Sequence, residues 1–236
     1  LLNSNIIISK QSTKSTMDYI KKTISHNSSN KIYFNENFTY SAKENDFFYY
    51  EDELGGLKLP KPNVNGQYQL ENITTAIATL RTLDIGVKEE HIQNGITKIS
   101  NVARLQEIKS GKLKELVKNN RLIVDGSHNE DGARALNEYL QTLDCNKHII
   151  ISMMANKEHE KYISYFKDIS SITTIDLKTQ PNSISGKDLK EKFKSIASVK
   201  YQPSIEQAIK SIDLEEGDLL LITGSLYGAA EVLSKN

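Results

Sequence analysis

Two stretches of the chain place chemically active side chains directly after an apolar run. The first reads Leu122-Ile-Val-Asp125-Gly126-Ser127-His128-Asn129, so a carboxylate and an imidazole follow a strand-like segment. The carboxylate could accept hydrogen bonds from ribose hydroxyls or orient a cation, and the imidazole could donate to a carboxylate or take a proton from an amine. The competing interpretation is structural, with Asn129 or Asp131 as a helix cap and His128 as a surface residue.

The second stretch reads Leu221-Ile-Thr223-Gly224-Ser225-Leu226-Tyr227, again an apolar run followed by a turn of small residues. Free backbone N–H groups and the Ser225 hydroxyl at a helix start would suit a carboxylate or a phosphate. Small residues also allow tight packing between a strand and a helix, which is the alternative function of this turn.

Two isolated polar side chains complete the set of candidates. Asn72 lies near the start of an alanine-rich helical segment and could present an amide donor and acceptor to a purine edge, although an asparagine there is more often a cap. Arg104, in Ala-Arg-Leu-Gln, could clamp phosphates with two nitrogens. A surface salt bridge is its ordinary alternative.

In the second half of the chain, the alternation of apolar runs and helical stretches predicts a parallel sheet that would position these residues. Apolar runs at 122–124, 149–152, 172–177, 199–201 and 219–223 alternate with helically spaced stretches about every 25 residues. This alternation predicts right-handed βαβ units with helices on both faces of the sheet. The continuous apolar run at 219–222 predicts a central strand, and residues 104–108 a flanking one.

The first half is less regular. We predict a strand at 6–9, a helix at 16–24 and two strands within the aromatic-rich segment 32–50, with a hairpin around 42–46. A loop is predicted from Gly55, Gly56, Pro60, Pro62 and Gly66, and helices follow at 70–83 and 88–99. The domain boundary is predicted near residue 100, which gives domains of 1–100 and 101–236.

Composition excludes several classes of protein. The 236 residues carry 30 basic and 30 acidic side chains, so the chain lacks the basic excess of a general nucleic-acid or acidic-membrane binder. A single cysteine, Cys145, excludes an intramolecular disulfide and a cysteine-based zinc site, and predicts a reducing compartment. No apolar run approaches the roughly 20 residues that span a bilayer.

The order of the motifs resembles one family. The asparagine-bearing helix, Ala-Arg-Leu-Gln, Val-Asp-Gly-Ser-His-Asn-x-Asp-Gly, Met-Met-Ala-Asn-Lys-Glu and Thr-Gly-Ser-Leu-Tyr resemble folylpolyglutamate synthase, the folate branch of the Mur ligase family, over residues 60–236. The resemblance implies an α/β fold. A Rossmann-like, mostly parallel C-terminal domain (101–236), which binds glutamate, follows the tail of a central, ATP-binding Mur ligase domain (1–100).

The resemblance also implies a reaction and a set of roles. Family members use ATP to activate a carboxylate of folate or dihydropteroate as an acyl phosphate, which the amine of L-glutamate attacks to form an amide. By resemblance, Asn72, Arg104 and Asp125 bind ATP at its adenine, phosphates and ribose, and His128 and Ser225 hold glutamate.

Three further expectations come from the resemblance. Lys157 lies in a family turn to which no role is given, and Ser127 replaces a commoner alanine. The implied cofactors are ATP and Mg²⁺. The implied setting is a cytoplasmic monomer without nucleic-acid or membrane partners.

Two family elements are missing from the sequence. A phosphate-binding loop of the form Gly-x-x-x-x-Gly-Lys-Ser/Thr does not occur in the 236 residues, and the family's magnesium ligands are not found either. We therefore expect the C-terminal portion of a ligase, inactive alone, with its metal ligands in the N-terminal part. The alternatives are a peptidoglycan-precursor Mur-type ligase and a non-catalytic module that binds a nucleotide or an amino acid.

Overall fold

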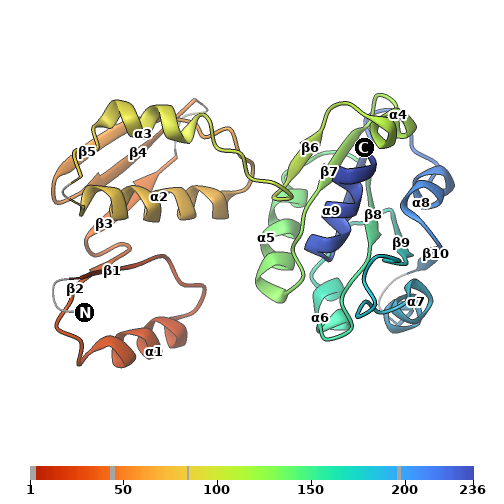
Figure 1. Cartoon of the computed structure of the whole chain (residues 1–236), viewed down its shortest axis with the longest axis horizontal. Helices are drawn as coiled ribbons and strands as arrows, with labels where there is room; N and C mark the ends of the chain where they lie inside the picture. The colour runs from red at the N-terminus through yellow and green to blue at the C-terminus, as the bar shows by residue number, and fades with distance from the viewer. Residues whose placement is uncertain (1–3, 43–45, 84, 196–197) are drawn as a thin grey trace. The chain divides into compact units, whose positions relative to one another are not determined.

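The computed structural model describes residues 4–42, 46–83, 85–195 and 198–236. The chain divides into two compact units (Figure 1). Unit 1 comprises Leu1–Asn63 and Gln67–Ser100, and unit 2 comprises Val64–Gly66 and Asn101–Asn236. The assignment of these parts to particular ligase domains stays a prediction.

Unit 2 is built on a mostly parallel sheet with the strand order β10-β9-β8-β11-β7-β6 (Figure 1). The parallel strands are β7 (Arg121–Val124), β8 (Lys147–Ile151), β9 (Ser171–Ile175), β10 (Val199–Gln202) and β11 (Leu219–Thr223). The edge strand β6 (Gln106–Ile108) runs antiparallel to β7. The predicted central position of 219–222 is confirmed, because β11 pairs with both β7 and β8.

Helices cover both faces of this sheet, as the alternation predicts. One face packs against α4 (Lys112–Val117), α8 (Ile205–Ser211) and α9 (Leu226–Lys235), whose apolar side chains share a core with Leu122, Ile150 and Leu220. The other helices are α5 (Glu130–Gln141), α6 (His159–Ser164) and α7 (Gly186–Phe193). Helix α6 contacts both α5 and α7. The α/β fold class predicted from the sequence is confirmed.

One small detail of unit 2 fixes its last helix to its first. Oδ1 of Asn236 accepts hydrogen bonds from the amides of Leu113 and Lys114, at the start of α4, both at 3.2 Å. Gly111, with a φ of +105°, leaves room for this contact, because a Cβ there would collide with Asn236. Asn236 therefore caps α4 from a distant part of the sequence.

Unit 1 begins with a parallel strand pair. Strand β1 (Asn5–Ile8) leads through α1 (Lys14–Ile24) to β2 (Asn30–Tyr33), which pairs with β1 in parallel. These elements match the predicted strand at 6–9 and helix at 16–24. Within the described residues, α1 has no buried side chain, although Met17, Ile20 and Ile24 form an apolar stripe along it.

An antiparallel meander and two helices complete unit 1. The meander has the order β3-β4-β5, with β3 (Phe38–Ser41), β4 (Phe47–Asp52) and β5 (Gly55–Pro60). The helices are α2 (Gln67–Arg81) and α3 (Glu89–Ile96). Strands β3 and β4 form the predicted hairpin, of which residues 43–45 lie outside the described residues.

The predicted loop from Gly55 to Gly66 is wrong over Gly55–Pro60, whereas residues 61–66 belong to no helix or strand. Residues Gly55–Pro60 form β5, in which Leu57 and Leu59 are buried while the alternate residues face outward. Gly55, with a φ of +106°, makes the tight turn from β4, and Pro60 ends the strand at the edge of the sheet. The segment 32–50, predicted to hold two strands, also contributes to three strands, β2, β3 and β4.

Candidate functional site

The carboxyl end of β7 carries a buried carboxylate that organises the surrounding loops. Asp125 is 2% exposed, and its Oδ2 accepts a hydrogen bond from the Leu105 amide while its Oδ1 accepts one from the Ser127 amide, both at 2.8 Å. Two backbone donors are charge-assisted partners for a carboxylate. Asp125 therefore joins the loop after β7 to the segment before β6.

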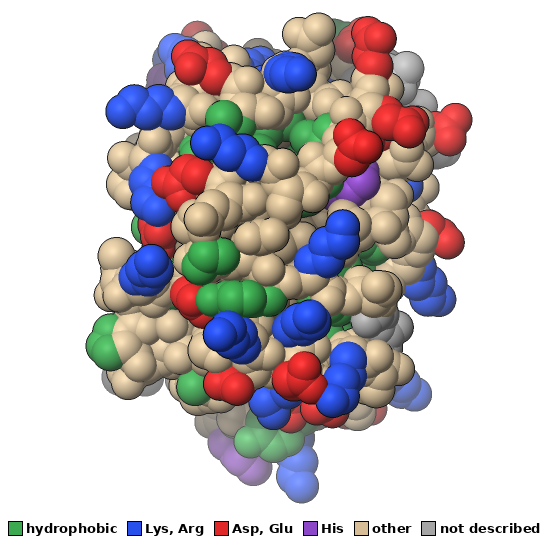
Figure 2. Space-filling model, turned by 90° about the vertical axis from the view of Figure 1, so that its right-hand side faces the viewer, with side chains coloured by type: hydrophobic (Ala, Val, Ile, Leu, Met, Phe, Trp, Pro, Cys, Tyr) green, Lys and Arg blue, Asp and Glu red, His purple; other side chains and the backbone are tan. Residues whose placement is uncertain are grey.

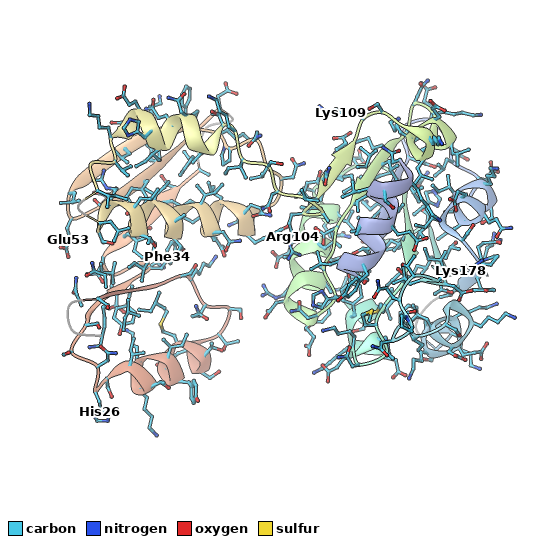
Figure 3. All side chains as sticks on the ribbon, viewed as in Figure 1. His26, Phe34, Glu53, Arg104, Lys109 and Lys178 are labelled. Carbon is cyan, nitrogen blue, oxygen red and sulfur yellow. The ribbon has the colours of Figure 1, made fainter. Side chains whose placement is uncertain are left out.

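That segment holds Arg104 in an unusual backbone turn. Ala103 and Leu105, on either side of it, have φ values of +56° and +47°, which are strained for residues with a side chain. The Gly126 amide donates to the Ala103 carbonyl at 2.8 Å, so the turn is held against the loop after β7. Figure 3 labels Arg104 at this turn.

Arg104 also differs from the other arginines in its partners. Arg81, Arg121 and Arg134 each contact a carboxylate. In the described part of the chain, no hydrogen bond or ion pair joins the Arg104 guanidinium to another residue, although the side chain is half-buried. The ordinary alternative of a surface salt bridge is therefore not what the structure shows, and the guanidinium remains free to bind an anion.

The imidazole of His128 has a defined tautomer. Its Nδ1 lies 3.0 Å from the Gly126 carbonyl oxygen, which can only accept, so Nδ1 must carry the proton. Nε2 of the neutral ring is therefore an acceptor, and no described residue donates a hydrogen bond to it. The next residue, Asn129, caps α5 by accepting from the Gly132 amide at 2.9 Å, as the structural alternative predicted.

Ser225 lies at the end of β11, where it caps α9. It is 2% exposed, and its Oγ accepts a hydrogen bond from the Tyr227 amide at 3.1 Å. The neighbouring Leu226 and Tyr227 are 45% and 51% exposed. The hydroxyl proton of Ser225 is still available for donation, but its position also fits the tight packing that was the alternative.

The sequence-predicted residues fall into two groups. Arg104, Asp125, His128 and Ser225 all belong to unit 2, and the strand ends and loops that carry them are neighbours, because β7 is paired with both β6 and β11. Asn72 belongs to unit 1. It lies in the second turn of α2, so it is not the cap of that helix, and its exposed amide has no hydrogen-bond partner among the described residues.

Sequence reasoning missed a set of hydroxyls beneath the unit 2 loops. Tyr162 of α6 lies with its oxygen 2.9 Å from Ser127 Oγ and 2.8 Å from Thr223 Oγ1. Tyr162 was not singled out because it fits the apolar stripe of its helix. A buried phenol has to find a polar partner, and that requirement is the signal that could have identified it.

Lys157, to which no role was given, lines a cavity of about 360 Å³ on unit 2. His159 lies beside it with Nε2 3.0 Å from the Met154 carbonyl oxygen. The other residues that line the cavity are Glu158, Glu160, Lys161 and Lys192. Charges of both signs are also interspersed over the face of unit 2 that Figure 2 shows.

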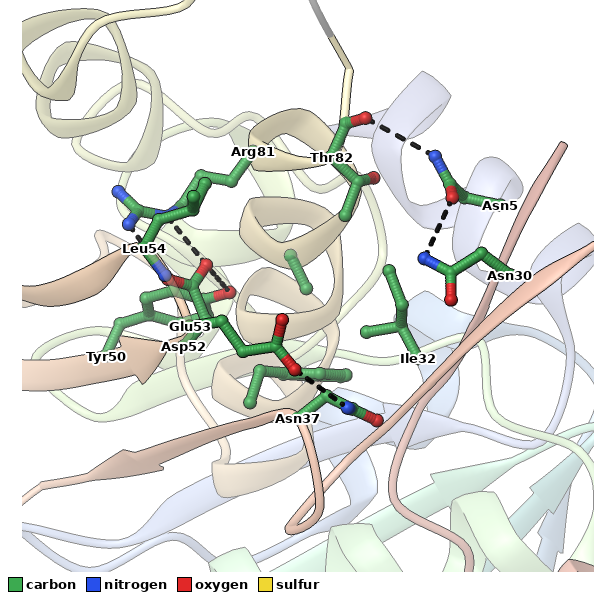
Figure 4. A pocket seen from close by; sticks show the side chains of 12 residues that line it. Asn5, Asn30, Ile32, Asn37, Tyr50, Asp52, Glu53, Leu54, Arg81 and Thr82 are labelled. Atoms are coloured by element: carbon green, nitrogen blue, oxygen red, sulfur yellow. Dashed lines mark hydrogen bonds and ion pairs between the residues drawn. The ribbon is translucent and has the colours of Figure 1, made fainter. Parts of the chain in front are cut away.

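A second cavity, of about 280 Å³, lies in unit 1 away from the predicted site residues (Figure 4). On one side, Arg81 Nε donates to Asp52 Oδ2 at 2.7 Å and Arg81 Nη2 donates to Asp52 Oδ1 at 2.9 Å. On another side, Asn30 donates to Asn5 at 3.3 Å. Glu53 also lines the cavity, and its Oε1 accepts a hydrogen bond from Asn37 at 3.3 Å.

No group of three or more His, Cys, Asp or Glu side chains among the described residues could hold a metal ion. Among the same residues, no helix is both long enough and apolar enough to cross a membrane.

Comparison with known proteins assigns the class of the second unit. Residues 112–226 match the family described as Mur ligase, glutamate ligase domain. Most of unit 2 is therefore similar to the glutamate ligase domain of Mur ligases, and the resemblance seen in the motifs is confirmed.

Particular relatives belong to the folate branch. The chain is 24% identical over 176 residues to the dihydrofolate synthase/folylpolyglutamate synthase of Bacillus subtilis (strain 168), covering 71% of this chain and 39% of that protein. E. coli FolC in complex with DHPP and ADP matches with a TM-score of 0.80 and 23% identity, over 98% of this chain and 53% of that one.

A third relative is the bifunctional folylpolyglutamate synthase/dihydrofolate synthase with Mn, AMPPNP and L-glutamate bound. It matches with a TM-score of 0.77 and 19% identity, over 98% of this chain and 53% of that one. These likenesses show the fold. The chain thus spans about half the length of the solved relatives and 39% of the curated one.

Proposed function

We propose that this chain supplies the glutamate-binding domain of an ATP-dependent ligase that adds L-glutamate to folate or dihydropteroate. The observation that carries the proposal is the fixed tautomer of His128 at the carboxyl end of β7, within the residues that match the glutamate ligase family. Ligands of open α/β sheets bind at this end of the strands. The relatives named above, from the folate branch, support folate over a peptidoglycan precursor.

In the proposed reaction, His128 acts on the amine of glutamate. Its Nε2 lone pair would accept a hydrogen bond from the ammonium group and take one proton, which leaves a neutral amine able to attack a carbonyl. The Gly126 carbonyl holds Nδ1–H throughout, so the ring stays oriented while Nε2 changes protonation. Ser225 and the free amides of the first turn of α9 would bind a glutamate carboxylate.

Arg104 and Asn72 are the residues proposed to contact the nucleotide. ATP would supply the phosphoryl group that activates the folate carboxylate. The free guanidinium of Arg104 suits its phosphates, and the unpartnered amide of Asn72 suits its base. Asp125 would contribute by fixing the Arg104 turn through the Leu105 amide, with any ribose contact made in addition.

Further parts of the proposal follow from the family resemblance. They are Mg²⁺ as the metal, the cytoplasm as the compartment and a monomer as the working state. The alternative, a non-catalytic module that binds an amino acid, would use the same glutamate site. It differs from the proposal because it predicts that glutamate does not change ATP turnover.

Calorimetric titration of the 236-residue chain with L-glutamate tests the proposal. We expect measurable binding that weakens at least tenfold in His128→Ala. The matched control is His26→Ala, an exposed histidine of unit 1 labelled in Figure 3. Equal affinities for the wild type and His128→Ala would exclude the role of His128, and no binding by the wild type would overturn the proposed function.

A further inference from the structure

Three buried hydroxyls form a closed ring beneath the loops that carry His128 and Ser225. The residues Ser127, Tyr162 and Thr223 are 6%, 0% and 3% exposed. The hydroxyl oxygen of Tyr162 lies 2.9 Å from that of Ser127 and 2.8 Å from that of Thr223, and the last two lie 3.4 Å apart. Three hydroxyls have three protons, so each can donate once and accept once around the ring. The ring therefore satisfies all of its own donors without water.

The ring joins three separate elements of unit 2. Ser127 belongs to the loop after β7, Thr223 ends β11, and Tyr162 comes from α6. Burial raises the pKa of the Tyr162 phenol, so the group stays protonated and keeps its donor at physiological pH. Tyr162 is the member that contacts both of the others at short distance.

The two loops above the ring also touch each other directly. A Cβ at Gly126 would collide with Leu226 Cδ2, so the loop after β7 is packed against the first residue of α9. Two of the three ring hydroxyls lie close in sequence to a residue of the proposed glutamate site: Ser127 precedes His128, and Thr223 is two residues before Ser225. A displacement of either loop would thus be transmitted to the other.

We propose that Tyr162 is a positioning residue of the glutamate site. It acts through Ser127 and Thr223 to fix the position of the His128 loop relative to the Ser225 loop. This inference rests on the proposed function for its ligand, but the coupling of the two loops is a property of the chain without ligand.

Amide hydrogen exchange on the ligand-free chain tests the coupling. The Ser127 amide, bound to Asp125, reports on one loop, and the Tyr227 amide, bound to Ser225, reports on the other. Tyr162→Phe removes the hydroxyl and keeps the packing of the aromatic side chain. In this variant we expect both amides to exchange about tenfold faster. The Gln207 amide, bound to Ser204 in α8, should not change.

Two controls separate the hydroxyl ring from ordinary packing. Tyr201→Phe removes a hydroxyl that donates to Asp176 elsewhere in unit 2, and it should leave both loop amides unchanged. Thr223→Val keeps the volume and loses the hydroxyl, whereas Thr223→Ser keeps the hydroxyl and loses a methyl group. We expect the loops to loosen in Thr223→Val and not in Thr223→Ser.

Titration with L-glutamate provides the second measurement. We expect the dissociation constant to rise about tenfold in Tyr162→Phe and in Thr223→Val, and to stay within twofold of the wild type in Thr223→Ser and Tyr201→Phe. Faster exchange in only one loop, or effects that follow volume instead of the hydroxyl, would overturn the positioning role. If the wild type binds no glutamate, the proposed function fails, and the exchange measurement alone decides whether the ring couples the loops.

Discussion

The parallel strands of the two units differ in how completely they are covered. In unit 2, every residue of β8 and β11 is buried, and helices pack on both faces of the sheet. In unit 1, the β1–β2 pair is half-exposed over most of its length, and the adjacent α1 buries none of its described side chains. Parallel sheets are ordinarily covered on both faces. We conclude that unit 2 owes its stability to its own core, and that β1–α1–β2 contributes little to that of unit 1.

The largest expected effect is at the centre of the unit 2 sheet. Leu220→Ala in β11 removes a fully buried side chain and leaves a cavity, so we expect the free energy of unfolding of unit 2 to fall by about 3 kcal/mol. Ile20→Ala in α1, where the side chain is half-buried, should cost less than about 1 kcal/mol. Urea unfolding of both variants measures the difference. Equal costs would contradict the comparison.

The next effect concerns an ion pair that gives unit 1 stability by other means. Asp52 and Arg81 are 12% and 15% exposed as side chains and form two hydrogen bonds. Burial would raise the pKa of Asp52, but hydrogen bonds from Arg81, Tyr50 and the Leu54 amide outweigh it and hold this pKa below its usual value.

Asp52→Asn should therefore lower the stability of unit 1 by about 2 kcal/mol at neutral pH. Because the folded-state pKa is lowered, the contribution of the pair is complete above the unfolded value of about 4 and disappears as the pH falls through the folded value. The variant and the wild type should thus converge in acid, as followed by urea unfolding at pH 7 and below pH 4. Glu53→Gln, at an exposed neighbouring carboxylate, is the control.

The smallest effect tests whether unit 2 is also fixed at its periphery. Asn236→Ala removes the cap of α4 and should cost about 1 kcal/mol, with faster hydrogen exchange at the Leu113 and Lys114 amides. Asn119→Ala, at an exposed asparagine after the same helix, should leave those amides unchanged. If both variants exchange alike, Asn236 does not stabilise α4.

Sequence patterns predicted unit 2 better than unit 1 for a physical reason. Strands buried on both faces need continuous apolar runs, and such runs are conspicuous at 122–124 and 219–223. Strand β5 was missed because its glycines and proline are typical of loops, while only Leu57 and Leu59 carry the alternation of a strand with one buried face.

The candidate site was predictable in its location and not in its contacts. Strand ends followed by polar residues identified Asp125, His128 and Ser225. The bond between Asp125 and the Leu105 amide depends on two left-handed residues other than glycine, which no local pattern indicates. The tautomer of His128 depends in the same way on a carbonyl whose direction only the folded loop defines.

The position of β11 has a consequence for the synthesis of the protein. This strand separates β7 from β8 in the sheet, yet it follows every other strand of unit 2 in the sequence. In the folded sheet, β7 and β8 pair with β11 and not with each other. As the chain leaves the ribosome, one apolar edge of each of these two strands therefore stays unpaired until β11 has been synthesised. The proposed glutamate site is thus complete only once β11 has been translated, and a nascent chain that ends before β11 would carry His128 without Ser225 beside it.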